Sequence, residues 1–219
     1  MAPRSSTRER LIRTAGELFW RQGYAATGVS QIMKRAGATS GSFYHFFPTK
    51  DELLLAVLDE VRRRTEDEVL DGIESTTTGA AGRVAALAEI YRAHAVPDAA
   101  DYGLPLGALA AEIGSGHESA RRRIDDGYEA VVERVASWFA EADGRRPHVA
   151  GDRRTAELVV ASLEGAALMA LVGGRAEPVD ACAEALTVHI EGRARSQESS
   201  QGLPPLVEET GGVGDWKAW

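Results

Sequence analysis

The chain has 219 residues, 44% of them hydrophobic and 6% aromatic, and its single cysteine, Cys182, excludes an internal disulfide. An alanine-rich composition with few aromatic residues disfavours a β-sandwich or barrel and predicts an all-α fold. The net charge of −8 is unevenly divided: residues 1–50 carry eight Lys or Arg against two Glu, or +6, whereas the remaining residues carry −14. We therefore expect an anionic partner to meet the N-terminal segment.

The sequence shows no sign of a targeting segment or of catalytic machinery. The first residues, MAPRSSTRERLIRT, lack the apolar core of a secretory signal, and no stretch reaches the roughly 20 uncharged apolar residues that cross a bilayer. Five histidines show no metal-binding spacing, and neither a G-x-S-x-G elbow nor a P-loop occurs. We expect a cytoplasmic protein with no membrane partner and no cofactor, and an enzyme is the less favoured alternative.

Three short helices are predicted in the first part of the chain. The first begins at a capping box formed by Ser6 and Glu9, carries apolar residues at helical spacing and ends at Gly23. Thr27 is the predicted N-cap of the second helix, and Thr39 that of the third, SGSFYHFF, which is ended by a proline. These helices form the expected helix-turn-helix domain, residues 1–50.

A longer helix is predicted from Lys50, where Thr49 and Glu52 form another capping box. The helical period continues to about residue 195, with breaks at segments rich in Gly, Pro and Asp. The expected helices cover residues 50–73, 79–95, 105–114, 117–142, 152–173 and 176–194. The sequence thus predicts about nine helices, with residues 51–195 as a ligand-binding and dimerisation domain and 196–219 as a flexible tail.

The third predicted helix has the form of a DNA-recognition helix. Two short helices joined by a glycine-containing turn suit the major groove, which is wide enough for one α-helix. Phe43 and Phe47 are expected to point inward because they are separated by four residues. The outward positions are then Ser40, Gly41, Ser42, Tyr44 and His45. A half-buried Tyr44 and a simple surface His45 are the alternatives at these two positions.

Residues 7 to about 54, above all TGVSQIMKRAGATSGSFYHFFPTKDELL, resemble the DNA-binding domain of the TetR family of bacterial regulators. The resemblance implies that Thr27, Tyr44 and Lys50 bind phosphates. It also implies that base edges or the adjoining backbone are contacted by Thr39, Ser40, Gly41, Ser42 and His45. Free N–H groups at helix N-termini favour phosphate binding, although Lys50 as a solvated first-turn residue is an alternative. Many family members have Lys where this chain has Ser40, so a phosphate or guanine contact is either missing here or replaced by Arg4, Lys34 or Arg35.

Two segments of the body indicate which branch of the TetR family the chain resembles and how two copies would pair. YGLPLGALAAEI is similar to the G-C-x-L-G-N-L-A-x-E stretch of the LmrA-like branch, with Leu104 in place of Cys and Ala108 in place of Asn. The resemblance implies that the last two helices form a four-helix interface between two copies. The segment TAELVVASLEGAALMALVGG contains small residues that would permit close packing: Ala161, Gly165, Ala166 and Ala170. A central helix of the body is the alternative interpretation.

An effector site in the body would be apolar, with few polar groups. The candidate ligand-binding residues are Tyr91, His94, Leu109, Glu112, Tyr128, Trp138 and Glu164. Ordinary core packing, or solvent exposure for the two glutamates, is the alternative. A carboxylate among apolar neighbours would favour a cationic or hydrogen-bonding effector.

Together these features predict a homodimeric, ligand-responsive transcriptional regulator that binds double-stranded operator DNA. The family resemblance implies a repressor, released from a palindromic operator by a small-molecule effector of unknown identity. An effector-independent DNA-binding regulator is the alternative. An enclosed pocket of at least ~300 Å³ would separate the two hypotheses.

Overall fold

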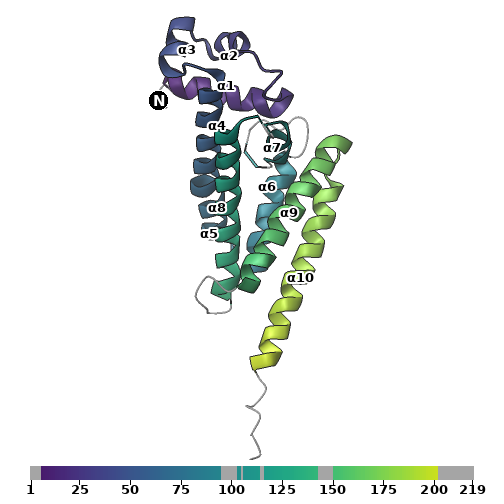
Figure 1. The fold of residues 1–219 in the computed structure, drawn as a ribbon. Helices are drawn as coiled ribbons and strands as arrows, with labels where there is room; N and C mark the ends of the chain where they lie inside the picture. The colour runs from purple at the N-terminus through teal and green to yellow at the C-terminus, as the bar shows by residue number, and fades with distance from the viewer. Residues whose placement is uncertain (1–5, 95–102, 105, 114–115, 143–149, 202–219) are drawn as a thin grey trace, which may run out of the picture.

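A computed structural model describes residues 6–94, 103–104, 106–113, 116–142 and 150–201. These residues form ten α-helices and one π-helix, and the described part of the chain contains no strand. Helices α1 to α3 form a small N-terminal unit at one end of the molecule, and the remaining helices form an elongated body (Figure 1). The predicted all-α fold is confirmed.

Helix α1 (Thr7–Gln22) begins as the sequence predicts. The Ser6 hydroxyl accepts a hydrogen bond from the Glu9 amide at 3.2 Å, and the Glu9 carboxylate accepts one from the Ser6 amide at 2.8 Å. This reciprocal pair satisfies two amides that the first helical turn leaves without partners. The apolar face predicted from the helical period is buried and consists of Leu11, Ile12, Ala15, Leu18 and Phe19.

The N-cap predicted for the second helix is wrong. Helix α2 (Val29–Ala36) has Gly28 as its N-cap, and the Thr27 side chain is fully buried. The Thr27 hydroxyl donates to the Gly23 carbonyl at 2.6 Å, so it stabilises the turn between the helices instead of capping α2. The predicted end at Gly37 is confirmed, since this residue has the left-handed φ of 62° that favours glycine.

Helix α3 (Ser40–Phe46) has the predicted cap and the predicted inward face. The Thr39 hydroxyl accepts a hydrogen bond from the Ser42 amide at 3.2 Å. Phe43 and Phe47 are buried in the core of the N-terminal unit. The other side of this short helix is therefore turned away from the core.

The helix predicted over 50–73 consists of three segments that follow one another without a break. These are α4 (Lys50–Arg64), the π-helix η1 (Thr65–Leu70) and α5 (Asp71–Thr76). Counting them as one, the described chain has nine continuous helical segments, in agreement with the predicted number. The π-helix was not predicted, because an apolar period near 3.6 does not specify a local change from i→i+4 to i→i+5 hydrogen bonds.

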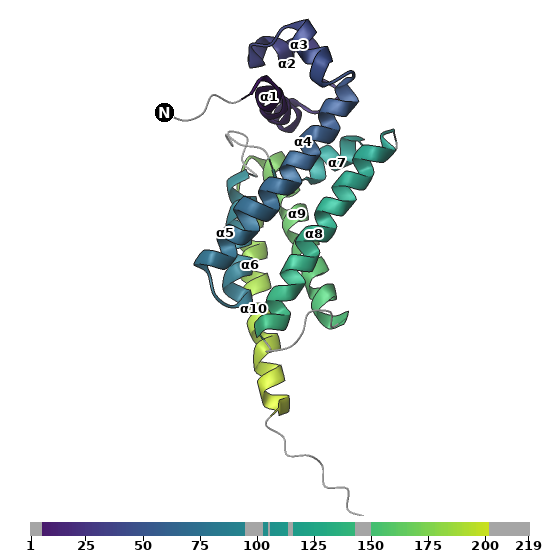
Figure 2. The ribbon, with the colours of Figure 1, turned by 90° about the vertical axis from the view of Figure 1, so that its left-hand side faces the viewer.

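The rest of the body comprises five helices: α6 (Ala80–His94), α7 (Gly107–Ile113), α8 (Glu118–Ala142), α9 (Ala150–Gly173) and α10 (Glu177–Gln201). Helix α9 packs against α6, α8 and α10, and α4 runs beside α8 (Figure 2). The short α7 lies at the end of the body next to α1. Because α10 continues to Gln201, the tail does not begin at residue 196 as predicted, and residues 202–219 lie outside the described chain.

Helix α9 is notable for its apolar composition, because the sequence analysis expected no stretch that could cross a bilayer. Within the described chain, the segment Gly151–Gly173 is long and apolar enough to cross a membrane by length and composition alone. Its buried residues, among them Val159, Leu163 and Ala167, belong to the core that the body helices share. A core helix of this kind meets the same criterion as a membrane span.

Candidate DNA interface and effector site

The outward side of α3 carries the polar residues that the sequence predicts there. Ser40, Gly41 and His45 are exposed, Thr39 is exposed beside them, and Ser42 is half-buried. The Tyr44 side chain is 56% exposed, and its ring packs edge-on against Phe43 with centroids 5.2 Å apart. The helix thus presents hydroxyl, imidazole and phenol groups on one surface.

Phe46 also lies on this surface, and the sequence analysis missed it. Its side chain is 37% exposed and packs edge-on against His45, with ring centroids 5.0 Å apart. The exposure of Phe46 could have been predicted from the inward pair Phe43 and Phe47, because a buried face that contains these two residues leaves Phe46 at its edge. An apolar ring therefore adjoins the polar groups of α3.

Basic side chains surround the N-terminal unit but are not all available to an external anion. Arg8 and Lys34 are exposed. Arg35 forms an ion pair with Glu17 at 3.1 Å, and the Arg10 guanidinium donates to the Ala36 carbonyl at 3.2 Å. Of the predicted substitutes for the missing Lys at position 40, Lys34 remains exposed, and Arg4 lies outside the described residues.

Lys50 and Thr27 are both engaged within the N-terminal unit. The Lys50 ammonium donates to the carbonyls of Tyr24 and Thr27, at 2.9 and 3.0 Å, and lies 4.0 Å from the centroid of the Tyr24 ring. These contacts tie the start of α4 to the turn between α1 and α2. The fully buried Thr27 side chain is not accessible to a phosphate in this conformation, because it faces the turn.

Tyr24 is the centre of this connection. Its hydroxyl donates to the carboxylate of Asp51, and its ring packs edge-on against Phe19 at 5.2 Å. Burial, followed by the hydrogen bond and negative charge of Asp51, raises the pKa of Tyr24 well above its ordinary value. The hydroxyl therefore remains a hydrogen-bond donor at any physiological pH.

Three of the predicted ligand-binding residues come together around the carboxylate of Glu164. One carboxylate oxygen accepts from the Tyr91 hydroxyl and the Leu106 amide, both at 3.1 Å, and the other accepts from the Gly107 amide at 2.9 Å. The Tyr128 hydroxyl lies close to this carboxylate as well, and each of the two groups influences the pKa of the other. Burial raises the pKa of Glu164, and the hydrogen bonds oppose that rise without cancelling it.

The other four predicted ligand-binding residues make no hydrogen bond with Glu164 where their side chains are described, and Glu112 and Trp138 have partners of their own. Glu112 accepts hydrogen bonds from the amides of Tyr24 and Ala25, and it is not among the residues that line the pocket between α4 and α8. The buried Trp138 donates its indole N–H to Glu74 at 2.6 Å, on the side of α8 that faces α5. Leu109 is buried in the common core, and the side chain of His94 lies outside the described part of the chain. Among the candidates whose side chains are described, Glu112 and Trp138 thus have partners other than Glu164.

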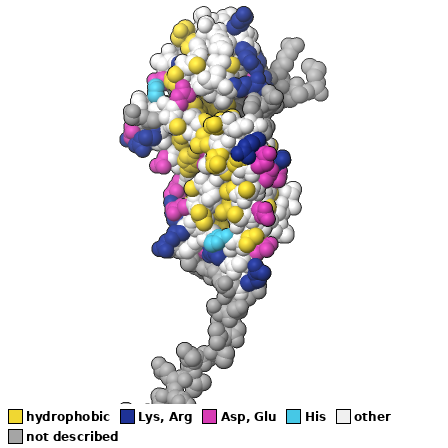
Figure 3. All heavy atoms as spheres, turned by 90° about the vertical axis from the view of Figure 1, so that its right-hand side faces the viewer, with side chains coloured by type: hydrophobic (Ala, Val, Ile, Leu, Met, Phe, Trp, Pro, Cys, Tyr) yellow, Lys and Arg dark blue, Asp and Glu magenta, His cyan; other side chains and the backbone are white. Residues whose placement is uncertain are grey.

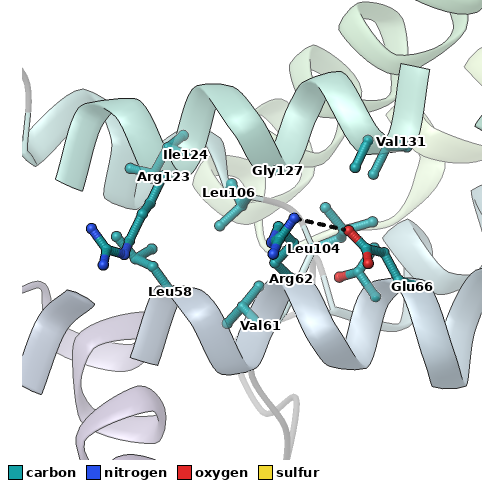
Figure 4. Close-up of a pocket in the computed structure, with 12 residues that line it drawn as sticks. Leu58, Val61, Arg62, Glu66, Leu104, Leu106, Arg123, Ile124, Gly127 and Val131 are labelled. Atoms are coloured by element: carbon teal, nitrogen blue, oxygen red, sulfur yellow. Dashed lines mark ion pairs between the residues drawn. The ribbon is translucent and has the colours of Figure 1, made fainter. Parts of the chain in front are cut away.

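A small pocket lies between α4 and α8, against the start of η1 (Figure 4). Its volume is about 10 Å³, which is room for about one water molecule. The apolar lining residues are Leu58, Val61, Leu104, Leu106, Ile124 and Val131. Arg62 and Arg123 also line it, and Arg62 is paired with Glu66 at 3.6 Å. This volume is far below the ~300 Å³ expected of a preformed effector site.

Helix α9 has an uncovered apolar face. Its exposed positions recur at helical spacing and are Leu158, Ala161, Gly165, Leu168, Met169 and Val172, whereas Ala166 and Ala170 point into the body. Val172 is 89% exposed, and Val188 on the neighbouring α10 is 61% exposed. Hydrophobic side chains accordingly gather in a band along this side of the body, with charged groups at its margins (Figure 3). An apolar band of this kind is typical of a protein–protein interface.

Two family patterns match the chain. The pattern described as "Bacterial regulatory proteins, tetR family" matches residues 11–57, and "Transcriptional regulator LmrA/YxaF-like, C-terminal domain" matches residues 80–185. The transcriptional regulator LmrA of Bacillus subtilis is 29% identical over 177 residues, which cover 79% of this chain and 90% of that protein. The regulator YxaF of the same organism is 28% identical and covers 86% of this chain and 97% of its own length.

Solved structures agree with this relationship. A TetR transcriptional regulator from Chloroflexus aurantiacus superimposes with a TM-score of 0.72 at 27% identity and covers 84% of this chain and 94% of its own. The reduced form of Escherichia coli NemR has the same fold, with a TM-score of 0.72 at 22% identity over 83% of this chain and 95% of that one. The chain therefore belongs to the TetR family of bacterial DNA-binding transcriptional regulators, and its C-terminal body belongs to the LmrA/YxaF-like group.

Proposed function

We propose that this regulator binds a palindromic operator as a homodimer and represses transcription until a small-molecule effector releases it. The observation that carries the proposal is the exposed polar surface of α3, which projects from the N-terminal unit at the end of the body. A helix with this surface fits the major groove, where base edges are distinguished by their hydrogen-bond donors and acceptors. The relationship to NemR of Escherichia coli supports the repressor assignment, since that protein, 26% identical over 182 residues, is named as a transcriptional repressor.

The contacts with DNA follow from what each side chain offers. Ser40 and His45 are placed against base edges, and the exposed backbone of Gly41 permits a close approach. The Tyr44 hydroxyl is placed against a phosphate, and Phe46 adds an apolar contact suited to the methyl group of thymine. Thr39 and Ser42 complete this surface at the N-terminal end of α3. Thr27 is omitted, because its side chain is buried.

Assembly is assigned to the apolar face of α9 together with Val188 of α10. One short recognition helix rarely binds tightly by itself, so regulators of this form read two half-sites about 34–36 Å apart, or a multiple of that spacing. A symmetric pairing of α9 and α10 from two copies would bury side chains that a monomer leaves in water. The same pairing would place both N-terminal units at the same end of the dimer.

The pocket between α4 and α8 is the proposed effector site. It is apolar, and the π-helix η1 begins at its lining residues Thr65 and Glu66. Such segments frequently lie at functional positions within α-helices. With a volume of about 10 Å³ it must open before it can hold a drug-sized molecule. The effector would therefore select a conformation that differs from the one described, and it would release DNA only by binding that conformation more tightly.

The small volume of this pocket also favours the alternative, a DNA-binding regulator without an effector. Thermal unfolding of the purified protein distinguishes the sensing hypothesis from the effector-independent one. The unfolding is measured in the presence of a panel of small apolar molecules, with and without charged groups. A compound that raises the melting temperature and weakens DNA binding supports the sensing hypothesis. If no member of the panel does either, the effector-independent hypothesis is favoured.

DNA recognition is tested by selecting duplexes from a random library with the purified protein and then measuring affinity for the selected sequence at several salt concentrations. We expect affinity to fall as salt rises, and Tyr44→Phe to weaken binding to all duplexes because the phosphate contact is lost. Ser40→Ala is expected to weaken discrimination between bases. Ser119→Ala, a matched change at an exposed serine in the first turn of α8, should have no effect. No salt-sensitive affinity for any duplex would refute the proposed function.

A further inference from the structure

Helix α7 is held at both ends by the same kind of contact. At each end a glutamate side chain accepts hydrogen bonds from two successive backbone amides, and a glycine adjoins its carboxylate. One end contacts the N-terminal unit, and the other contacts the helix that carries the apolar face of the body. Neither contact involves the α3 surface, and the contact with Glu164 includes Leu106, whose side chain lines the pocket between α4 and α8.

At the C-terminal end of α7, Glu112 reaches the turn between α1 and α2. Its two carboxylate oxygens accept from the amides of Tyr24 at 2.8 Å and Ala25 at 2.7 Å. A Cβ atom on Gly23 would lie 2.7 Å from the carboxylate, so the contact requires glycine there. Hydrogen bonds of amides to a carboxylate are shorter and stronger than bonds between neutral groups.

His117, just beyond α7, adds a second contact with the same turn. Its ring packs edge-on against Tyr24 with centroids 5.3 Å apart. Its Nδ1 lies 3.6 Å from the carboxylate of Asp51, which also accepts the hydrogen bond of the Tyr24 hydroxyl. Tyr24 is therefore held from the body through both its backbone amide and its ring.

At the N-terminal end of α7, the buried Glu164 of α9 accepts from the amides of Leu106 and Gly107. A Cβ atom on Gly107 would lie 2.9 Å from this carboxylate, so glycine permits the close approach here as well. The hydroxyl of Tyr91 on α6 donates to the same carboxylate at 3.1 Å, and Tyr128 of α8 lies close to it. Three body helices thus fix one end of α7 through a single side chain.

We propose that α7 acts as a strut that sets the position of the α1–α2 turn relative to α9, with Glu112 and Glu164 as its positioning residues. A displacement of the body helices around Glu164 would be passed along α7 to Tyr24. Because Lys50 and Asp51 connect Tyr24 to α4, the start of α4 would move with the turn. The effect on operator affinity rests on the proposed function, whereas the mechanical connection does not.

The connection is tested by amide hydrogen exchange in the full-length protein without DNA. Glu112→Ala removes both acceptors, and we expect the Tyr24 and Ala25 amides to exchange about tenfold faster or more. Glu164→Gln leaves one acceptor oxygen where the carboxylate has two, so the Gly107 amide loses its partner without a change in side-chain volume. We expect this change also to accelerate hydrogen exchange of the Tyr24 and Ala25 amides, by about threefold or more, although residue 164 makes no hydrogen bond with them.

Glu157→Gln, an exposed glutamate on α9, is the matched control and should leave the exchange of Tyr24 and Ala25 unchanged. Amides of the buried α1 residues Leu11 and Ala15 report on global unfolding and should exchange at the same rate in all variants. The strut is refuted if Glu164→Gln releases Gly107 but leaves Tyr24 and Ala25 unchanged, or if Glu112→Ala does not accelerate them. Equal acceleration of Leu11 and Ala15 would indicate a general loss of stability and would also refute it. Because no DNA is present, failure to bind an operator would count only against the proposed function.

Discussion

The ammonium group of Lys50 and the ring of Tyr24 form a cation–π contact of 4.0 Å, and the same ammonium donates a hydrogen bond to the Tyr24 carbonyl. The first residue of the long α4 is thus attached to the turn that precedes α2. Lys50 is also the residue that the family resemblance places against a phosphate. The structural and DNA-binding roles of this side chain make different predictions.

Lys50→Ala is expected to lower the free energy of unfolding by about 1–2 kcal/mol, because two carbonyls and an aromatic face lose a charged partner. Urea unfolding measures this loss, and Lys34→Ala, at an exposed lysine of α2, should not cause it. If Lys50 also binds a phosphate, the slope of log affinity against log salt should decrease by about 0.9 in the variant. A variant as stable as the wild-type protein would contradict the structural role.

Gly23→Ala is expected to destabilise the protein by about 1–3 kcal/mol. The residue has a φ of 86°, and its Cβ would collide with the carboxylate of Glu112. Gly72→Ala is the comparison, since Gly72 lies in α5 with open space at its Cβ position. Gly72→Ala should be neutral or stabilising, by up to about 1 kcal/mol. Thermal or urea unfolding of both variants measures the difference. Equal effects of the two substitutions would contradict the assignment of Gly23.

The buried Glu164 is expected to make stability depend on pH. Because burial raises its folded-state pKa above the ordinary value of 4.5, the folded protein holds this proton more tightly than the unfolded chain does. The resulting stabilisation is fully present below about pH 4.5 and is lost as pH rises through the folded-state pKa. Urea unfolding at a series of pH values should show that Glu164→Gln removes this decline, whereas Glu157→Gln retains it. An unchanged pH dependence in Glu164→Gln would refute the assignment.

Val172→Asp is expected to weaken self-association by about 10- to 100-fold, which corresponds to about 1.4 to 2.8 kcal/mol. Val172 lies in the apolar face of α9, and a carboxylate there would lose its hydration on dimerisation. Sedimentation of dilute protein measures the change. Ser119→Asp adds the same charge to an exposed position on α8 and should leave the association constant unaltered. A variant that remains dimeric would place the interface elsewhere.

Local features of the N-terminal unit were predictable from the sequence. The caps at Ser6 and Thr39 involve residues only three positions away, and the left-handed end at Gly37 depends on its own backbone. The inward Phe43 and Phe47 follow from the helical period alone. The resemblance to the TetR family then assigned the outward surface of α3 to DNA, although the contact residues themselves remain predictions.

Contacts between distant segments were not predictable in this way. Thr27 has the side chain of an N-cap, yet the turn places its hydroxyl against Gly23, and the backbone of Gly28 begins α2 instead. Glu112 and Glu164 have similar apolar neighbours in the sequence. Glu112 is exposed and contacts the N-terminal unit, whereas Glu164 is buried beside Tyr91. Their different partners arise from the packing of α7 against α1 and α9.

The sequence by itself determined the all-α fold, most helix boundaries and the polar side of α3, because caps and apolar periods act between residues within four positions of each other. Only the tertiary structure decided which carboxylates meet which amides, since Glu112 and Tyr24 are 88 positions apart in the chain. It also decided how small the pocket between α4 and α8 is. Such contacts depend on how complete helices pack together, and one helix's hydrophobic pattern does not specify the neighbour that will cover it.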